Sequence, residues 1–228
     1  MSQSLSLSSA VLAASVGAAV LYATLVRSRP SVWRMTIKTC STALLAAVVM
    51  VEGGPLRLAG ALALGSLGDA FLAWDDETSF FRGLASFLAA HLLYIAVFTH
   101  GKTEVHIFWA LLTSSGWRAA AAGSLALLVP TMVALLLPRL GQALRAPVVV
   151  YSLTIFVMAF SALTLDSPHV VARALMFTAS DSILAADRFL VAPTSPHKPW
   201  MQHAVWVLYY AGQFLIAMGF LALQTSGL

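Results

Sequence analysis

Two aspartates, Asp69 and Asp181, lie inside long apolar stretches of the sequence and have similar neighbours. The first stretch reads Gly-Asp-Ala-Phe-Leu-Ala over 68–73, and the second reads Ser-Asp-Ser-Ile-Leu-Ala over 180–185. An ionised carboxylate in hydrocarbon is costly, so such residues usually face the interior of a helix bundle and mark function. The pair therefore favours acid–base chemistry. The alternative is a structural pair held by interhelical hydrogen bonds.

Two neighbouring carboxyl groups can act as acid and base together. Desolvation disfavours the anion, so a carboxyl group in apolar surroundings can still hold a proton near neutral pH. A second carboxylate nearby strengthens this effect, and the pair then shares one proton. The sequence leaves open which of Asp69 and Asp181 is the acid and which is the base.

The composition indicates a membrane protein. Of the 228 residues, 60% are hydrophobic and only 10% are charged, whereas a soluble domain carries roughly 25% charged residues. The isoelectric point of about 9.6 does not indicate nucleic-acid binding, because the basic residues are scattered and form no cluster. The single cysteine, Cys40, excludes an intrachain disulfide, and no span holds the His-x-x-x-His spacing of a zinc hydrolase such as the alkaline ceramidases. We expect no metal and no cofactor.

The apolar segments predict an all-α, polytopic transmembrane bundle of about eight helices, which forms a single membrane domain over 1–228. The first segment is interpreted as a span, not as a removed signal peptide. The second is short, so we expect it to be tilted or re-entrant. Residues 102–118 are expected to form an interfacial helix or loop. The eight expected spans lie near 7–26, 36–51, 56–74, 80–98, 119–137, 146–163, 169–189 and 203–223.

The basic residues predict the orientation of these spans. Nine Lys and Arg residues lie at the links after the first, third, fifth and seventh spans, and four lie at the other links. The positive-inside rule then places the first set in the cytosol and both termini outside or in the lumen. Spans 56–74 and 169–189 run in the same direction, so both aspartates lie in the cytosolic halves of their spans. We therefore expect a polar cavity that is open toward the cytosolic leaflet.

A weak internal repeat accompanies the two aspartates. Asp181 follows Asp69 by 112 residues, and the stretch Val-Leu-Tyr-Tyr-Ala at 207–211 resembles Leu-Leu-Tyr-Ile-Ala at 92–96, 115 residues earlier. The pattern predicts two four-helix halves in parallel orientation with the site between them. Chance similarity in a chain rich in Ala and Leu is the alternative.

Five motifs in order resemble the lysoplasmalogenase (YhhN-like) family of integral membrane proteins. They cover most of the chain between about Lys38 and Gly219, and lie at 68–72, 87–94, 147–151, 177–189 and 209–213. The resemblance implies about eight transmembrane helices and hydrolysis of the vinyl-ether bond of lysoplasmalogens, which are alkenyl lysophospholipids. The products are a fatty aldehyde and a glycerophospho-headgroup. The essential aspartates of the family correspond to Asp69 and Asp181. The acidic link Asp75-Asp76-Glu77 has no counterpart in the resemblance.

Other polar residues are candidates for binding the substrate or the attacking water. The ammonium of Lys38 can pair with the lipid phosphate as a point charge, or it can reach toward the interface as a positive-inside residue. His91 is a candidate proton carrier, although hydrogen bonding to a neighbouring helix is the commoner role. The remaining candidates, some of which are equally compatible with packing, are Tyr94, Tyr151, Ser180, Tyr209, Tyr210 and Gln213.

Two other function classes compete with the hydrolase. A proton-coupled transporter of a small molecule or lipid would also use an intramembrane Asp pair and a repeat. It would show Gly/Pro-broken spans at equivalent positions of both halves. Pro130 is expected to break the fifth span, but the equivalent first span has no Pro. A non-catalytic scaffold would leave the aspartates without a purpose. The headgroup preference and the oligomeric state stay open. The family resemblance implies the endoplasmic reticulum membrane for a eukaryotic source, and we expect the inner membrane for a bacterial one.

Overall fold

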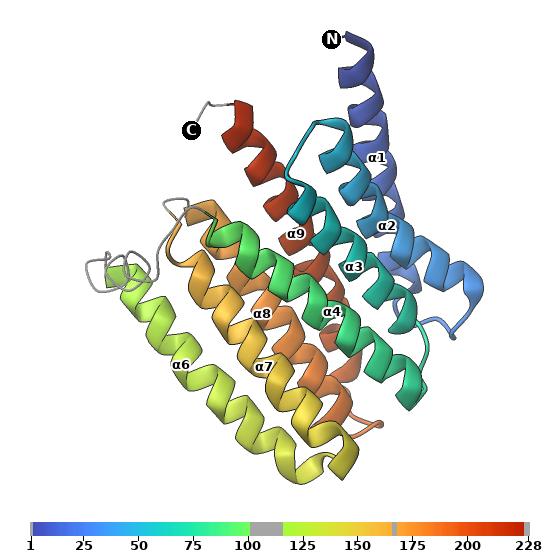
Figure 1. Cartoon of the computed structure of the whole chain (residues 1–228). Coiled ribbons are helices and arrows are strands. Elements are labelled where there is room, and N and C mark those ends of the chain that lie inside the picture. The colour runs from blue at the N-terminus through green and yellow to red at the C-terminus, as the bar shows by residue number, and fades with distance from the viewer. Residues whose placement is uncertain (1, 101–115, 166–167, 226–228) are drawn as a thin grey trace.

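The computed structural model describes residues 2–100, 116–165 and 168–225, and these form a helical bundle (Figure 1). The predicted segment 102–118 lies outside the described residues, apart from the start of α6. The prediction of an all-α bundle of about eight helices is confirmed. The helices are α1 (Ser2–Leu25), α2 (Val32–Val51), α3 (Leu56–Phe71), α4 (Glu77–Phe98), α6 (Gly116–Leu136), α7 (Gln142–Ala162), α8 (Pro168–Phe189) and α9 (Lys198–Thr225).

Polar and small residues set the ends of the helices that carry the site. Ser31 caps α2, because its side chain accepts a hydrogen bond from the backbone N–H of Arg34. Gly53 follows α2 with a φ of 68°, a conformation that suits glycine. Asp76 caps α4 by accepting a hydrogen bond of 2.8 Å from the N–H of Ser79. Hydrogen bonding by the side chain and then by the backbone of Ser79 lowers the pKa of the exposed Asp76 carboxyl. The acidic link therefore provides the N-cap of α4.

Six of the described helices are long and apolar enough to cross a membrane, so the chain is a multi-pass integral membrane protein. The other two are α3 and α8, and they carry Asp69 and Asp181. Helix α3 has only 16 residues, and α8 holds charged residues at Arg173, Asp181, Asp187 and Arg188. The expected short second span is wrong, because α2 begins at Val32 and has 20 residues.

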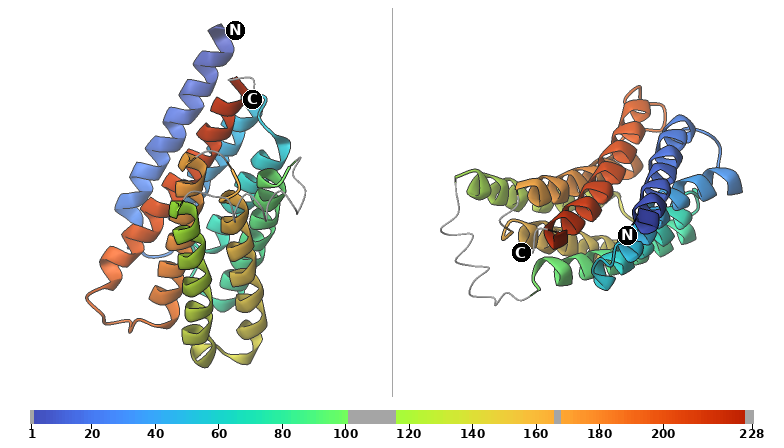
Figure 2. Two further views of the ribbon diagram at one scale, coloured as in Figure 1. Left: turned by 90° about the vertical axis from the view of Figure 1, so that its left-hand side faces the viewer. Right: turned by 90° about the horizontal axis from the view of Figure 1, so that it is seen from above.

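Contacts between the described helices divide them into two groups, α1 to α4 and α6 to α9, which meet through α4 and α9. Figure 2 shows the bundle from two further directions. Helices α1 to α4 each pack on the next, and so do α6 to α9. Helix α4 also packs on α7, and α9 packs on α1 and α2. Both termini lie at the same end of the bundle (Figure 1), as an even number of crossings requires. The two aspartates occupy the third helix of each group, which is the arrangement that the predicted repeat requires.

Helix α6 corrects one expectation. Pro130 lies inside the continuous helix Gly116–Leu136 and does not break it. The broken span that the transporter hypothesis would use is therefore not present in this helix.

Candidate active site

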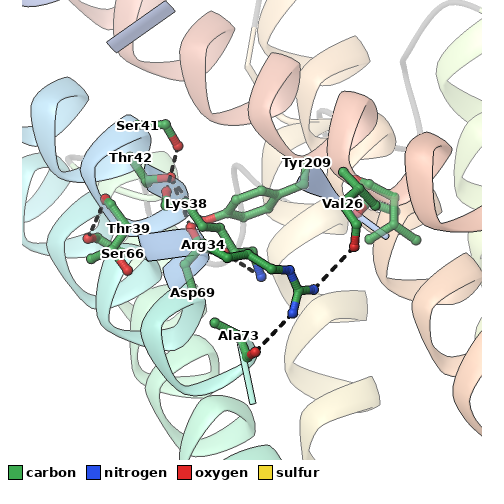
Figure 3. Close-up of polar contacts among 12 residues, drawn as sticks. Val26, Arg34, Lys38, Thr39, Ser41, Thr42, Ser66, Asp69, Ala73 and Tyr209 are labelled. Atoms are coloured by element: carbon green, nitrogen blue, oxygen red, sulfur yellow. Dashed lines mark hydrogen bonds and ion pairs between the residues drawn. The ribbon is translucent and has the colours of Figure 1, made fainter. Parts of the chain in front are cut away.

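Asp69 lies near the C-terminal end of α3 and is almost completely buried, with 1% of its surface exposed. Its Oδ1 lies 3.3 Å from the ammonium of Lys38 on α2. Its Oδ2 accepts hydrogen bonds from the hydroxyls of Thr42 at 3.0 Å and Tyr209 at 2.7 Å. Figure 3 shows these side chains converging from α2, α3 and α9. Asp69 is thus a carboxylate with a cation and two hydroxyl donors.

Asp181 lies on α8 and is partly exposed. Its Oδ2 accepts a hydrogen bond of 2.7 Å from the hydroxyl of Tyr151 on α7. Within the part of the chain that the structure describes, it forms no ion pair. Asp181 therefore differs from Asp69 in having one neutral donor and no cation.

An aromatic cluster connects the two tyrosines that bind the aspartates. Phe87 and Phe177 each pack edge-on against Tyr209, with ring centroids 5.7 and 5.4 Å apart. His91 packs edge-on against Phe177 at 4.9 Å and against Tyr151 at 5.4 Å. The two tyrosines that bind the aspartates are thus held by one set of rings.

Glycine allows this cluster to approach α3. A Cβ atom added at Gly68 would lie 2.6 Å from the ring of Phe87, closer than real side chains come. Gly68 directly precedes Asp69, so the small residue before the aspartate has a packing reason. A Cβ at Gly65 would lie 3.1 Å from the amide nitrogen of Gln213 and 3.4 Å from the hydroxyl of Tyr209.

A large polar cavity of about 770 Å³ contains both aspartates. It is lined by residues of α1, α2, α3, α4, α8 and α9 and by the links next to them. Acids and bases are balanced along its wall, which also holds the indole of Trp206 and the ring of Tyr209. The charged lining residues are Arg34, Lys38, Asp69, Asp75, Asp181, Asp187, Arg188 and Lys198.

A smaller pocket of about 80 Å³ adjoins this cavity between α4, α6, α7 and α8. We call it the apolar slot. Its wall is mostly aliphatic and aromatic, and includes Val129, Met132, Val148 and Ile155. Asp181 and the hydroxyl-bearing Tyr151 also line it.

The structure gathers part of the predicted set around the cavity. Lys38, Ser180 and Tyr209 line the large cavity, and Tyr151 lines the slot. The hydroxyl of Ser180 donates a hydrogen bond of 2.9 Å to the carbonyl of Val205 on α9. The contact of Lys38 with a lipid phosphate stays a prediction, since its ammonium is paired with Asp69 in the structure.

The other predicted residues line neither cavity. His91 is buried, and its Nδ1 lies 2.5 Å from the carbonyl of Phe87 on its own helix; the expected partner on a neighbouring helix is wrong for this nitrogen. Tyr94 donates a hydrogen bond to Gln213, behind Tyr209. Tyr210 points to α1, where its hydroxyl lies 2.7 Å from that of Ser15. These residues support the site from outside.

Sequence reasoning missed Arg34 and Thr42 as site residues. Their spacing to Lys38 is four residues on each side, so the three share one face of α2. The guanidinium of Arg34 donates to the carbonyls of Ala73 at 3.0 Å and Val26 at 3.2 Å, which holds the ends of α3 and α1 together. Its Nε is buried without a hydrogen-bond partner among the described residues.

Asp187 forms an ion pair with a neighbouring helix. Its Oδ1 lies 3.3 Å from the ammonium of Lys198 on α9. The guanidinium of Arg188 lies over the ring of Phe80, 4.2 Å from the centroid. Both residues line the large cavity.

The arrangement can transfer protons in a site shielded by apolar rings. Two carboxyl groups reach the same cavity, and each is oriented by a tyrosine hydroxyl. Cationic side chains in the wall can hold an anionic group of a ligand. An apolar pocket next to one carboxyl group can accept a hydrocarbon.

Comparisons with known proteins give one family. Residues 33–220 match the YhhN family. Lysoplasmalogenase TMEM86B of Homo sapiens is 30% identical over 75% of this chain and 66% of its own length, and that of Mus musculus is 32% identical over 83% and 73%. Lysoplasmalogenase TMEM86A of Bos taurus is 28% identical over 71% and 64%. The chain thus spans about two thirds of the length of these relatives. No solved structure matches. The resemblance indicated by the motifs is confirmed.

Proposed function

The chain belongs to the YhhN family, and we propose that it is a membrane hydrolase that cleaves the vinyl-ether bond of alkenyl lysophospholipids. The observation that carries the proposal is the placement of Asp69 and Asp181 on the wall of one cavity. Its relatives named lysoplasmalogenases support the substrate class. The products would be a fatty aldehyde and a glycerophospho-headgroup. The membrane would be the endoplasmic reticulum in a eukaryote and the inner membrane in a bacterium.

The reaction needs one acid and one base. A carboxyl group donates a proton to the β-carbon of the vinyl ether, and the α-carbon becomes an oxocarbenium ion. Water adds to that carbon and gives its proton to a carboxylate. The hemiacetal then collapses: the carbon–oxygen bond to glycerol breaks, and the alcohol oxygen takes the proton that the second carboxyl group accepted from water. The hemiacetal hydroxyl gives its proton to the first carboxylate, and the aldehyde leaves. Overall one water is consumed, and both aspartates return to their starting state. The nearby carboxylate also stabilises the cationic intermediate.

The polar cavity is suited to the glycerophospho-headgroup. Arg34 is the best candidate for the phosphate, because its guanidinium lines the cavity and forms no ion pair with the described carboxylates. Lys38 can share this role while it neutralises Asp69. Aromatic side chains such as Trp206 can pack against a quaternary ammonium headgroup.

The direct test is aldehyde release from purified protein in detergent. The wild type is given an alkenyl lysophospholipid, with the ester-linked and saturated ether analogues as controls. Asp69→Asn and Asp181→Asn should fold but release no aldehyde. Asp76→Asn is the matched control, since this exposed cap lies outside the cavity and Asn also caps helices well. A folded wild type that releases no aldehyde would reject the hydrolase and favour proton-coupled transport.

A further inference from the structure

Asp181 occupies the junction between the large cavity and the apolar slot. Six described side chains line both spaces, and Asp181 is the one carboxyl group among them. The other five are apolar. The shared residues are Leu72, Phe80, Phe87, Asp181, Leu184 and Phe189. Asp69, by contrast, lines only the large cavity and not the slot.

The two spaces differ in size and chemistry in the way that the two ends of a lysolipid differ. The large cavity of about 770 Å³ holds four cationic and four acidic side chains. Among the described residues that line the slot of about 80 Å³, none is cationic. A phosphate group is therefore disfavoured in the slot, because burying it there without a partner is costly. Hydrocarbon suits this wall and gains from leaving water.

On the basis of the proposed function, we propose that the alkenyl chain enters the apolar slot while the headgroup stays in the large cavity. The vinyl ether joins these two parts of the substrate, so it lies at their junction, beside Asp181. Asp181 is then the group that donates the proton to the β-carbon. Asp69, which is paired with Lys38 and lines the large cavity, is the carboxylate that accepts the proton of the attacking water.

Narrowing the slot tests this arrangement. Ala185 lines the slot one helical turn beyond Asp181, whereas the adjacent Ala186 lines neither space. Ala185→Leu and Ala186→Leu are therefore a matched pair. A second pair lies on α7: Val148 is 6% exposed and lines the slot, whereas Val150 is 50% exposed. Val148→Phe and Val150→Phe form this pair.

The readout is the ratio of kcat/KM for a long and a short alkenyl chain on the same glycerophospho-headgroup. Ala185→Leu and Val148→Phe should lower this ratio at least about tenfold, because pocket volume discriminates chain length. Ala186→Leu and Val150→Phe should keep the wild-type ratio. If a folded slot variant keeps the wild-type ratio, or loses activity equally on both substrates, the chain does not lie in the slot.

Binding of the saturated ether analogue separates this inference from the proposed function. The analogue has the same headgroup and chain but no vinyl ether to cleave, so its affinity is measured without turnover. Ala185→Leu should weaken its binding relative to Ala186→Leu even if the wild type releases no aldehyde. Equal affinities of the two variants would overturn the assignment of the slot. If the wild type releases no aldehyde but Ala185→Leu binds the analogue more weakly than Ala186→Leu, only the hydrolase is rejected and the assignment of the slot is kept.

Discussion

The two aspartates have similar sequence frames and equivalent helices, but different partners. Asp69 is nearly fully buried and is bound by an ammonium and two hydroxyls. Asp181 is partly exposed and is bound by one hydroxyl. The charge of Asp69 is therefore balanced by a cation. Asp181 lies beside the apolar wall of the slot and has one neutral donor.

The origin of the difference is the residue on the second helix of each group. Lys38 on α2 precedes Asp69 by 31 residues, and Tyr151 on α7 precedes Asp181 by 30 residues. The fold thus offers each aspartate a partner from a corresponding position. A lysine there stabilises an anion, whereas a tyrosine orients a carboxyl group in either protonation state. A duplicated frame can in this way supply an acid and a base with separate tasks.

The largest expected difference is in stability when each aspartate becomes an amide. Asp69→Asn leaves the ammonium of Lys38 without its counter-ion, and we expect a loss of roughly 3 kcal/mol in the free energy of unfolding, the low end of the cost of breaking a buried pair. Lys38 faces the large cavity, which limits the cost. Asp181→Asn removes no ion pair and keeps the bond from Tyr151, so its stability should match the wild type.

Unfolding of both variants in detergent, followed by tryptophan fluorescence, measures this difference. The double variant Lys38→Met with Asp69→Asn should recover part of the loss, because it removes the unpaired charge. If Asp181→Asn is destabilised as strongly as Asp69→Asn, the two carboxyl groups are equivalent and the comparison fails.

The hydroxyl donors provide the next test. Tyr151→Phe removes the donor that the structure gives Asp181. We expect kcat for aldehyde release to fall about 10- to 100-fold, the cost of one hydrogen bond to a group that becomes charged as it gives up its proton. Tyr209→Phe should have a smaller effect, because Asp69 keeps Lys38 and Thr42. Tyr210→Phe is the control, since this hydroxyl bonds Ser15 on α1. Equal effects of Tyr151→Phe and Tyr210→Phe would contradict the assignment.

The residue before each aspartate can be exchanged between the frames. Gly68→Ser places a side chain against the ring of Phe87, and overpacking of this kind costs about 1–3 kcal/mol. Ser180→Gly loses the hydrogen bond to Val205 and adds a helix glycine, and should cost about 1 kcal/mol. Thermal unfolding of the two variants shows which substitution lowers the stability more. A Gly68→Ser variant as stable as the wild type would show that the ring can move away.

Much of the site could be predicted from the sequence, because buried charges stand out in apolar helices. The two aspartates and Lys38 stand out in this way. Arg34 and Thr42 were missed, although their spacing places them with Lys38 on one face of α2. The sequence did not indicate which way the side chains of Tyr209 and Tyr210 point. Adjacent helical residues point about 100° apart, and the sequence does not say which one faces α3.

The apolar slot was beyond sequence reasoning for a different reason. Its wall combines residues of four helices, and most of them are ordinary aliphatic or aromatic side chains in their own helices. The length of α3 was also misjudged, because the loop Leu72–Asp76 continues the apolar pattern for three residues beyond the last helical turn. Tertiary packing, not local pattern, decided both features.

Thr42 should give the smallest of these effects. Thr42→Val keeps the shape of the side chain and removes one of the two hydroxyl donors to Oδ2 of Asp69. Because Tyr209 and Lys38 remain, we expect a loss of about 1 kcal/mol in the free energy of unfolding and a fall in kcat smaller than that of Tyr151→Phe. Thr36→Val is the matched control on α2, since this exposed hydroxyl bonds the carbonyl of Val32. A loss with Thr42→Val as large as with Asp69→Asn would mean that the hydroxyls, and not the ammonium, hold the charge of Asp69.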